Sequence, residues 1–228
     1  SGGGTLELAS GTLTLTGSAV NISSGTMFHQ SGGTVTGAGG LLVNGEYSFT
    51  DGTHGGTGTT TISSTGNGSI TGAFSKTISR MIVNDGSLVW SGATVTFSSG
   101  AGLTNNGTFD AQSVSGVLGS GGNGSIVNNG TFSRTTGTVN AQIATAFINN
   151  GTTNIQSGTL QSTLSTSGSG AFVINTGSKY ILSSGNHTLD GNTISGGGTL
   201  ELASGTLTLT GSPVNITSGT LFHQNGGI

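Results

Sequence analysis

The chain has 228 residues, of which 46 are glycine, none is cysteine, four are Lys or Arg and seven are Asp or Glu, giving a net charge of −3. The absence of cysteine excludes disulfides, thiol nucleophiles and thiolate metal sites. Lys76, Arg80, Arg134 and Lys179 are too few to neutralise a nucleic-acid backbone, and no apolar run approaches the roughly 18 residues of a membrane span. We therefore expect neither a nucleic-acid partner nor membrane contact.

Taken in chain order, the sequence repeats a unit of about 21 residues: an apolar pair, a short Asn, Ser or Gly turn, and a strand-like run. Within a unit, apolar residues alternate with polar ones, as in TLTLT (12–16), which is the period of a β-strand. The clearest copies are LLVNGEYSF (41–49), IVNDGSLVW (82–90), LTNNGTF (103–109), IVNNGTF (126–132), FINNGTTNI (147–155) and VINTGSKYI (173–181), and weaker ones are SGGGTLEL (1–8) and ISSGTMF (22–28).

A longer repeat contains these units. Residues 195–228 repeat residues 1–34 at an offset of 194, with five differences in 34 positions: Ala19/Pro213, Ser23/Thr217, Met27/Leu221, Ser31/Asn225 and Thr34/Ile228. The last glycine of each turn marks nine steps that close this offset: Gly4, Gly25, Gly45, Gly68, Gly86, Gly107, Gly130, Gly151, Gly177 and Gly198. We therefore predict that residues 1–194 form one long repeat of about nine whole turns. Residues 195–228 would then begin the next repeat and continue the same coil.

These units predict an all-β fold, a parallel β-solenoid whose turns each contain three short strands. Corner glycines would adopt positive φ, and stacked corner asparagines would hydrogen-bond from turn to turn. Asn-Gly turns also fit β-hairpins, so an antiparallel sandwich is the alternative. The nine phenylalanines, about one per turn, are expected to form one stacked core column. The expected turn and ladder residues are Asn84, Gly86, Asn106, Gly107, Asn129, Gly130, Asn150, Gly151 and Gly177.

Two stretches, GGGTLELASGTLTLTGSAVNI (2–22) and LTNNGTFDA (103–111), carry a resemblance to a known group. They resemble the β-helical passenger regions of bacterial autotransporter adhesins and filamentous-haemagglutinin-like exoproteins. The resemblance extends through most of the chain. It implies a right-handed parallel β-helix on a bacterial surface, serving as a stalk or adhesin.

Catalytic or metal-binding side chains are not clustered in the sequence. Glu7 and Asp110 share a phase but are expected to lie five turns, roughly 24 Å, apart, too far for the carboxylate pair of a glycosidase. Only Glu46 and Asp51 fall in one turn, which makes them the weak candidates for a metal or catalytic pair. Isolated, solvated carboxylates are the simpler interpretation, and we expect no cofactor. The histidines have no paired spacing and are expected at the surface or at corners: His29, His54, His187 and His223.

Together these observations predict a non-enzymatic structural or adhesive shaft of a long, tandemly repeated fibre, extracellular or on a cell surface. Its partners would be neighbouring repeats, laterally associated shafts, and glycans or a receptor at a tip outside this segment. The alternative is a glycan-binding or polysaccharide-cleaving β-helix, which requires an exposed carboxylate pair. A minor alternative is an ice-binding face of outward threonines such as Thr12, Thr14, Thr34 and Thr36, although their phase varies between turns in the sequence.

Overall fold

A computed structural model describes residues 3–98, 100–121 and 124–228, and within these residues it contains 32 β-strands and no helix. The strands form three sheets, called here A, B and C. Sheet A contains β1 (Thr5–Leu8), β4 (Met27–Gln30), β7 (Glu46–Phe49), β10 (Asn67–Ile70), β13 (Ser87–Trp90), β16 (Thr108–Ala111), β19 (Thr131–Arg134), β22 (Thr152–Ile155), β25 (Ala171–Ile174), β28 (Thr193–Ser195) and β31 (Asn215–Ile216).

The other two sheets are built in the same way. Sheet B contains β2 (Thr12–Thr14), β5 (Thr34–Thr36), β8 (Thr53–His54), β11 (Lys76–Ile78), β14 (Val95–Phe97), β17 (Val117–Ser120), β20 (Asn140–Ile143), β23 (Thr159–Ser162), β26 (Lys179–Leu182), β29 (Thr199–Leu202) and β32 (Leu221–Gln224). Sheet C contains β3 (Val20–Ile22), β6 (Leu41–Val43), β9 (Thr59–Ile62), β12 (Met81–Asn84), β15 (Gly102–Asn105), β18 (Ser125–Asn128), β21 (Ala146–Asn149), β24 (Ser165–Ser167), β27 (Asn186–Leu189) and β30 (Thr206–Leu209).

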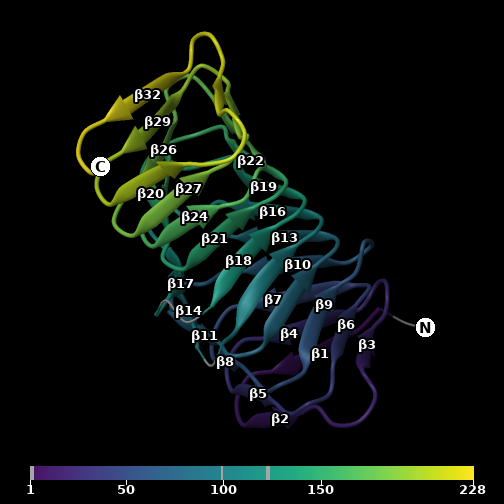
Figure 1. Cartoon of the computed structure of the whole chain (residues 1–228). Coiled ribbons are helices and arrows are strands. Elements are labelled where there is room, and N and C mark those ends of the chain that lie inside the picture. The colour runs from purple at the N-terminus through teal and green to yellow at the C-terminus, as the bar shows by residue number, and fades with distance from the viewer. Residues whose placement is uncertain (1–2, 99, 122–123) are drawn as a thin grey trace.

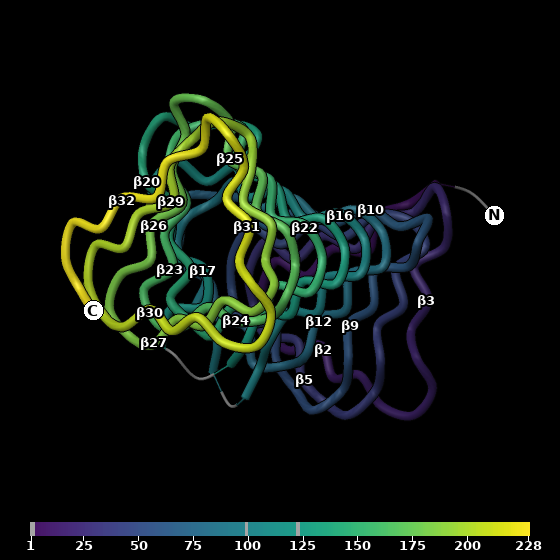
Figure 2. Tube along the Cα trace, turned by 45° about the horizontal axis from the view of Figure 1, so that its top comes forward, coloured from purple at the N-terminus to yellow at the C-terminus, as the bar shows by residue number. Residues whose placement is uncertain are grey.

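The chain coils through the three sheets in a fixed order. Each turn contributes one strand to sheet A, one to B and one to C, and the strands stack in parallel on the turn before (Figure 1). Viewed closer to the axis, the turns follow one another as a coil with loops of variable length at the corners (Figure 2). Buried side chains fill the interior of this coil. The predicted parallel β-solenoid is confirmed, and the antiparallel sandwich is wrong.

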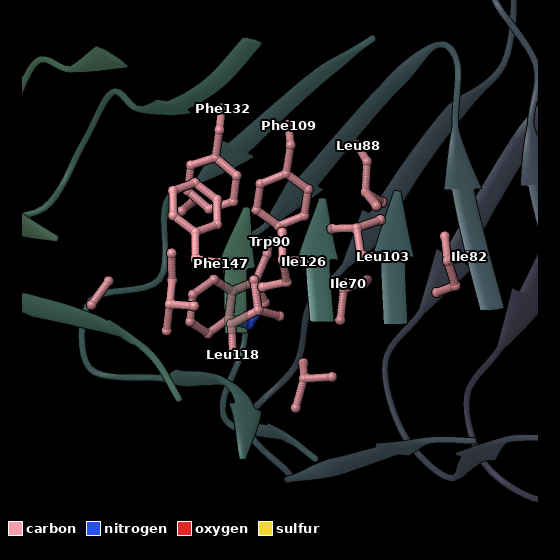
Figure 3. Close-up of a cluster of buried hydrophobic side chains, with 14 of the residues drawn as sticks. Ile70, Ile82, Leu88, Trp90, Leu103, Phe109, Leu118, Ile126, Phe132 and Phe147 are labelled. Carbon is pink, nitrogen blue, oxygen red and sulfur yellow. The ribbon is translucent and has the colours of Figure 1, made fainter. Parts of the chain in front are cut away.

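The core forms because inward-facing and outward-facing residues alternate along each strand. In β22, for example, Thr153 and Ile155 point inward and are buried, while Thr152 and Asn154 face outward. Because the turns are in register, inward residues of successive strands lie on top of one another (Figure 3). Phe109 and Phe132 stack in this way, with ring centroids 4.8 Å apart.

The phenylalanines do not form one column, contrary to the prediction. Seven are buried, but they come from all three sheets: Phe28, Phe49, Phe97, Phe109, Phe132, Phe147 and Phe172. Phe74 lies in the segment between β10 and β11 and is 68% exposed, and Phe222 of β32 is 38% exposed. The roughly regular spacing of phenylalanines in the sequence therefore does not predict whether each ring points into the core or toward solvent.

The long repeat does not contain a whole number of turns. Its first strand, β1, lies in sheet A, whereas the equivalent strand 194 residues later, β29, lies in sheet B. The offset is 28 strands (29 − 1), which at three strands per turn is nine turns and one strand. Residues 195–228 add strands to the same three sheets, but each strand occupies the sheet after that of its equivalent. Successive copies are therefore rotated by one third of a turn about the coil axis.

The prediction of nine whole turns is wrong because of one corner. Gly151 lies at the corner from sheet C to sheet A, and the equivalent corner one turn later ends at Gly170, since Ala171 N donates to Gly151 O. Gly177, chosen as the next marker, instead lies between β25 and β26, at the corner from A to B. Both corners contain glycine preceded by polar residues, because both require a tight change of direction. A count of turn glycines along the sequence therefore passes from the corner between sheets C and A to the corner between sheets A and B without a visible break in the pattern.

Candidate functional site

The corner between sheets C and A carries two rows of stacked, hydrogen-bonded asparagine side chains. The last residue of β12, β15, β18 and β21 is an asparagine that points inward and is fully buried: Asn84, Asn105, Asn128 and Asn149. Each of the first three donates from Nδ2 to Oδ1 of the next, over 2.7, 2.8 and 2.8 Å. We call this set the inner ladder.

The inner ladder also ties the sheets together. The Nδ2 group of Asn128 donates to Thr152 O of β22 over 3.1 Å, and the other three members make the same kind of contact one turn on. The backbone carbonyl of Asn105 accepts from Asn129 N and Gly130 N of the next turn, over 2.8 and 3.0 Å. Each buried amide therefore holds the end of a strand in sheet C to the following turn of sheet A.

A second, outer ladder runs beside the first on the solvent side. Asn106, Asn129 and Asn150 each donate to the residue one turn earlier, and the last acceptor is the carboxylate of Asp85. The three distances are 2.8, 2.9 and 3.0 Å. The outer ladder donates toward the N-terminal end and the inner ladder toward the C-terminal end, so their amide dipoles oppose each other. Stacked amides of this kind stabilise cross-β assemblies.

Glycine is needed at these corners for a different reason from the one predicted. Gly86, Gly107, Gly130 and Gly151 do not have positive φ, so the prediction of left-handed corners is wrong for them. Instead, a Cβ atom added to Gly107 would overlap Gly86 O, and one added to Gly130 would overlap Gly107 O. The turns stack too closely here for any side chain. Gly177 does have a positive φ, of 82°.

The marker Gly68 is not a corner residue. It lies in β10 and points into the core, where the Cδ1 atoms of Ile62 and Leu88 occupy the space that a side chain would fill. The corner glycine of that turn is Gly66, whose added Cβ would overlap Val43 O.

Three of the four basic side chains are buried. Arg80 donates to the carbonyl oxygens of Gly39, Gly55 and Gly58, at 2.7, 3.3 and 3.0 Å. Arg134 donates to three carbonyls in the same manner: Ala111, Ser113 and Val139. Among the ion pairs of the described residues, neither guanidinium takes part, and burial lowers the pKa of both. These arginines fasten corner loops from inside and offer no basic surface.

Lys76 is the third buried cation. Its Nζ donates to Phe74 O over 2.7 Å, and burial lowers its pKa, partly offset by the nearby Asp51 carboxylate. Only Lys179 is exposed among the four basic residues, and it pairs with Glu201 at 3.1 Å.

Two histidines also lie inside, where surface or corner positions were expected. His54 Nδ1 lies 2.9 Å from Gln30 Oε1, and His54 Nε2 lies 2.8 Å from Thr60 Oγ1. Burial, with a smaller contribution from the Arg80 charge, lowers the pKa of His54 to about 3, so the ring is neutral at physiological pH. His187 is fully buried and contacts Ser184 O at 2.8 Å. His29 is half-buried and His223 is exposed.

The carboxylates stay dispersed. Glu46 begins β7, whereas Asp51 follows the end of that strand and accepts from Gly52 N over 2.7 Å. Glu46 and Asp51 are therefore separated by the length of β7, whose four residues span about 10 Å at roughly 3.3 Å per residue. Glu7 and Asp110 occupy the same outward row of sheet A, five strands apart. Within the described residues, no group of three or more His, Asp or Glu side chains is close enough to hold a metal ion.

Outward threonines are more regular than the sequence indicated. Thr12, Thr34, Thr53, Thr77 and Thr96 pair in register across β2, β5, β8, β11 and β14, one threonine per turn. The expected variation in phase is therefore wrong for this part of sheet B. Corner loops of different length absorb the variation that is visible in the sequence.

No protein-family model, curated protein or solved structure matches this chain. Across the described ranges, the structure has no helix of the length and apolarity needed to cross a membrane.

Proposed function

We propose that this chain is a segment of a non-enzymatic structural shaft in a long extracellular or cell-surface fibre, of the type that presents an adhesive tip. The observation that carries the proposal is the unbroken stacking of all three sheets, from the first turn into residues 195–228. A coil of this kind lengthens by adding turns, each supported by its neighbours. The resemblance of the corner and strand motifs to autotransporter and haemagglutinin-like passenger regions supports a bacterial surface location.

The outer wall supports the same function. Of the 11 charged side chains, four are buried: Lys76, Arg80, Arg134 and Glu201. The outward rows are dominated by Thr, Ser and Asn, whose hydrogen bonding does not depend on salt. Such a wall has few charges to repel a neighbouring shaft, so lateral association into bundles is part of the proposal.

The length of tandem arrays tests the shaft. Proteins with one, two and three copies of the 194-residue repeat should appear in electron micrographs as straight rods. Each copy should add roughly 45 Å, since nine and a third turns of about 4.8 Å follow from the strand spacing. Separate beads joined by flexible connections, or a length that does not grow in proportion to copy number, would contradict the shaft.

The threonine row on sheet B supports a second candidate function, binding to ice. The five threonines of this row lie on adjacent strands. The row therefore presents one hydroxyl and one methyl group about every 4.8 Å along the coil. Thr14 and Thr36 begin a second row beside it. If this face binds ice, the chain should show thermal hysteresis that Thr53→Lys abolishes and Ser133→Lys, on sheet A, leaves unchanged. Absence of hysteresis in the unmodified chain would exclude this function.

A further inference from the structure

The outer face of sheet C is apolar in the middle of the coil. One outward residue of each strand from β6 to β21 lies in register with the next, and together they form what we call the sheet C row: Leu42, Thr61, Val83, Thr104, Val127 and Ile148. Four of these six residues are Leu, Val or Ile, and all six are partly exposed. Other turns cover each of these turns on both sides, so the exposure of the row belongs to the wall of the coil.

Sheet A shows that the solenoid fold does not itself require an apolar wall. The strands that directly follow those of the sheet C row, β7 to β22, carry an outward row of their own in register: Ser48, Ser69, Val89, Asp110, Ser133 and Asn154. Only one of these six residues is apolar. Sheets with one face in water ordinarily present polar residues outward, and sheet A follows this rule where sheet C does not. Outward apolar residues that line up over neighbouring strands are typical of a surface that binds another protein.

Charge distinguishes sheet C in the same way. Of the three sheets, it is the only one whose described strands contain no Asp, Glu, Lys or Arg. Outward charged residues lie on sheet A, as Glu46 and Asp110, and on sheet B, as Lys179. Two sheets packed face to face lie about 10 Å apart, and a charge between them without a partner would oppose the contact. Sheet C can therefore be covered without burying a charge, provided that the covering sheet is uncharged too.

We propose that the outer face of sheet C is the lateral contact between two copies of this chain, packed sheet against sheet. A second copy brings the same uncharged, apolar face, so a symmetric pair leaves no charge buried at the contact. The inference rests on the proposed shaft and names the surface through which shafts associate.

The size of the face is sufficient for a specific contact. The eight strands of sheet C from β6 to β27 extend about 38 Å along the coil at roughly 4.8 Å per strand, and up to four residues of each strand extend about 13 Å at roughly 3.3 Å per residue. The footprint is therefore about 500 Å² per copy and about 1,000 Å² for the pair, at the lower limit of specific protein–protein interfaces. A contact of this size predicts weak association that depends on concentration.

Val127→Lys tests the contact. Val127 points outward in β18, so the separate chain should tolerate lysine there, which circular dichroism and urea unfolding can verify. In the pair the lysine charge would be buried without a partner, so association should weaken at least about tenfold. The measurement is sedimentation of the purified 228-residue chain at concentrations up to about 1 mM. Val83→Lys, two turns earlier in the sheet C row, should weaken association to a similar extent.

Ser133→Lys is the matched control, because it places the same charge in the outward row of sheet A, on the strand that directly follows β18. It should associate as the unmodified chain does. The proposal is overturned if the unmodified chain stays monomeric at every concentration, which would assign the face to a different partner. It is also overturned if Val127→Lys associates normally, or if Ser133→Lys weakens association equally.

Tandem arrays separate this inference from the shaft. Arrays that carry Val127→Lys in every copy should form rods as long as those of unmodified arrays, but these rods should no longer associate laterally. Rods of the expected length together with a monomeric 228-residue chain would contradict the sheet C contact and leave the shaft in place. Arrays that form separate beads would contradict the shaft, whereas sedimentation of the 228-residue chain would still test the contact.

Discussion

Asn128→Ala should lower the free energy of unfolding by about 3 kcal/mol. The substitution removes the bond that Asn105 donates to Asn128 and the two that Asn128 donates, to Asn149 Oδ1 and Thr152 O. It leaves one N–H of the buried Asn105 amide and the buried Oδ1 atom of Asn149 without the partner that Asn128 supplied, although Asn105 Nδ2 keeps its bond to Thr131 O. Each buried polar group that loses its partner costs roughly 1–3 kcal/mol. The measurement is urea unfolding, with hydrogen exchange of β15, β18 and β21 as a local readout, because a repeat array can unfold in parts.

Asn129→Ala is the control, one residue further along the chain. Asn129 also makes two ladder bonds, to Asn106 and from Asn150, but all three side chains are exposed. Water replaces these bonds, so the loss should be below about 1 kcal/mol. Equal losses in the two variants would mean that burial does not set the strength of the inner ladder.

These neighbouring asparagines show what the sequence could predict. The recurrence of Asn-Gly near 21 residues is sufficient to predict a solenoid and to place Asn106, Asn129 and Asn150 at stacked corners. It did not distinguish the inner ladder, of which only Asn84 was predicted. The inward position of Asn128 could have been predicted, because residues alternate in direction along a strand and Ile126, two residues earlier, is buried.

Other interior groups could not be derived from pattern alone. Arg80 and Arg134 are buried because corner loops present carbonyl oxygens to the inside of the coil. The path of those loops depends on tertiary packing, and a charged side chain in a polar sequence ordinarily indicates the surface. His54 is buried for a comparable reason, since its partners Gln30 and Thr60 come from other strands.

The rotation of the long repeat changes what a tandem array would present to its surroundings. If further copies follow the same 28-strand offset, a given outward residue reaches sheets A, B and C in three successive copies. Any lateral contact that one copy makes would then recur on all three sides of the coil. A repeat of nine whole turns would instead align every copy along one side, which favours flat, one-directional bundles. The extra strand would therefore affect how neighbouring arrays of such repeats pack together.

Phe132→Ala should destabilise the chain by about 3–5 kcal/mol, the usual cost of removing a buried aromatic ring. Phe132 is fully buried and contacts aromatic rings of two other strands, Phe109 at 4.8 Å and Phe147 at 5.2 Å between centroids. The cavity cannot close easily, because the backbone ladders of β16, β19 and β22 hold the turns at a fixed spacing. Thermal or urea unfolding measures the loss.

Phe74→Ala removes the same ring from a position that the sequence pattern treats as equivalent. Because Phe74 is 68% exposed, the change should stay within about 0.5 kcal/mol of zero, as for other surface substitutions. A loss as large as that of Phe132→Ala would show that the segment between β10 and β11 packs against the coil. A small loss in both variants would mean that the stacked aromatic core contributes little, and that the backbone and asparagine ladders supply most of the stability of the coil.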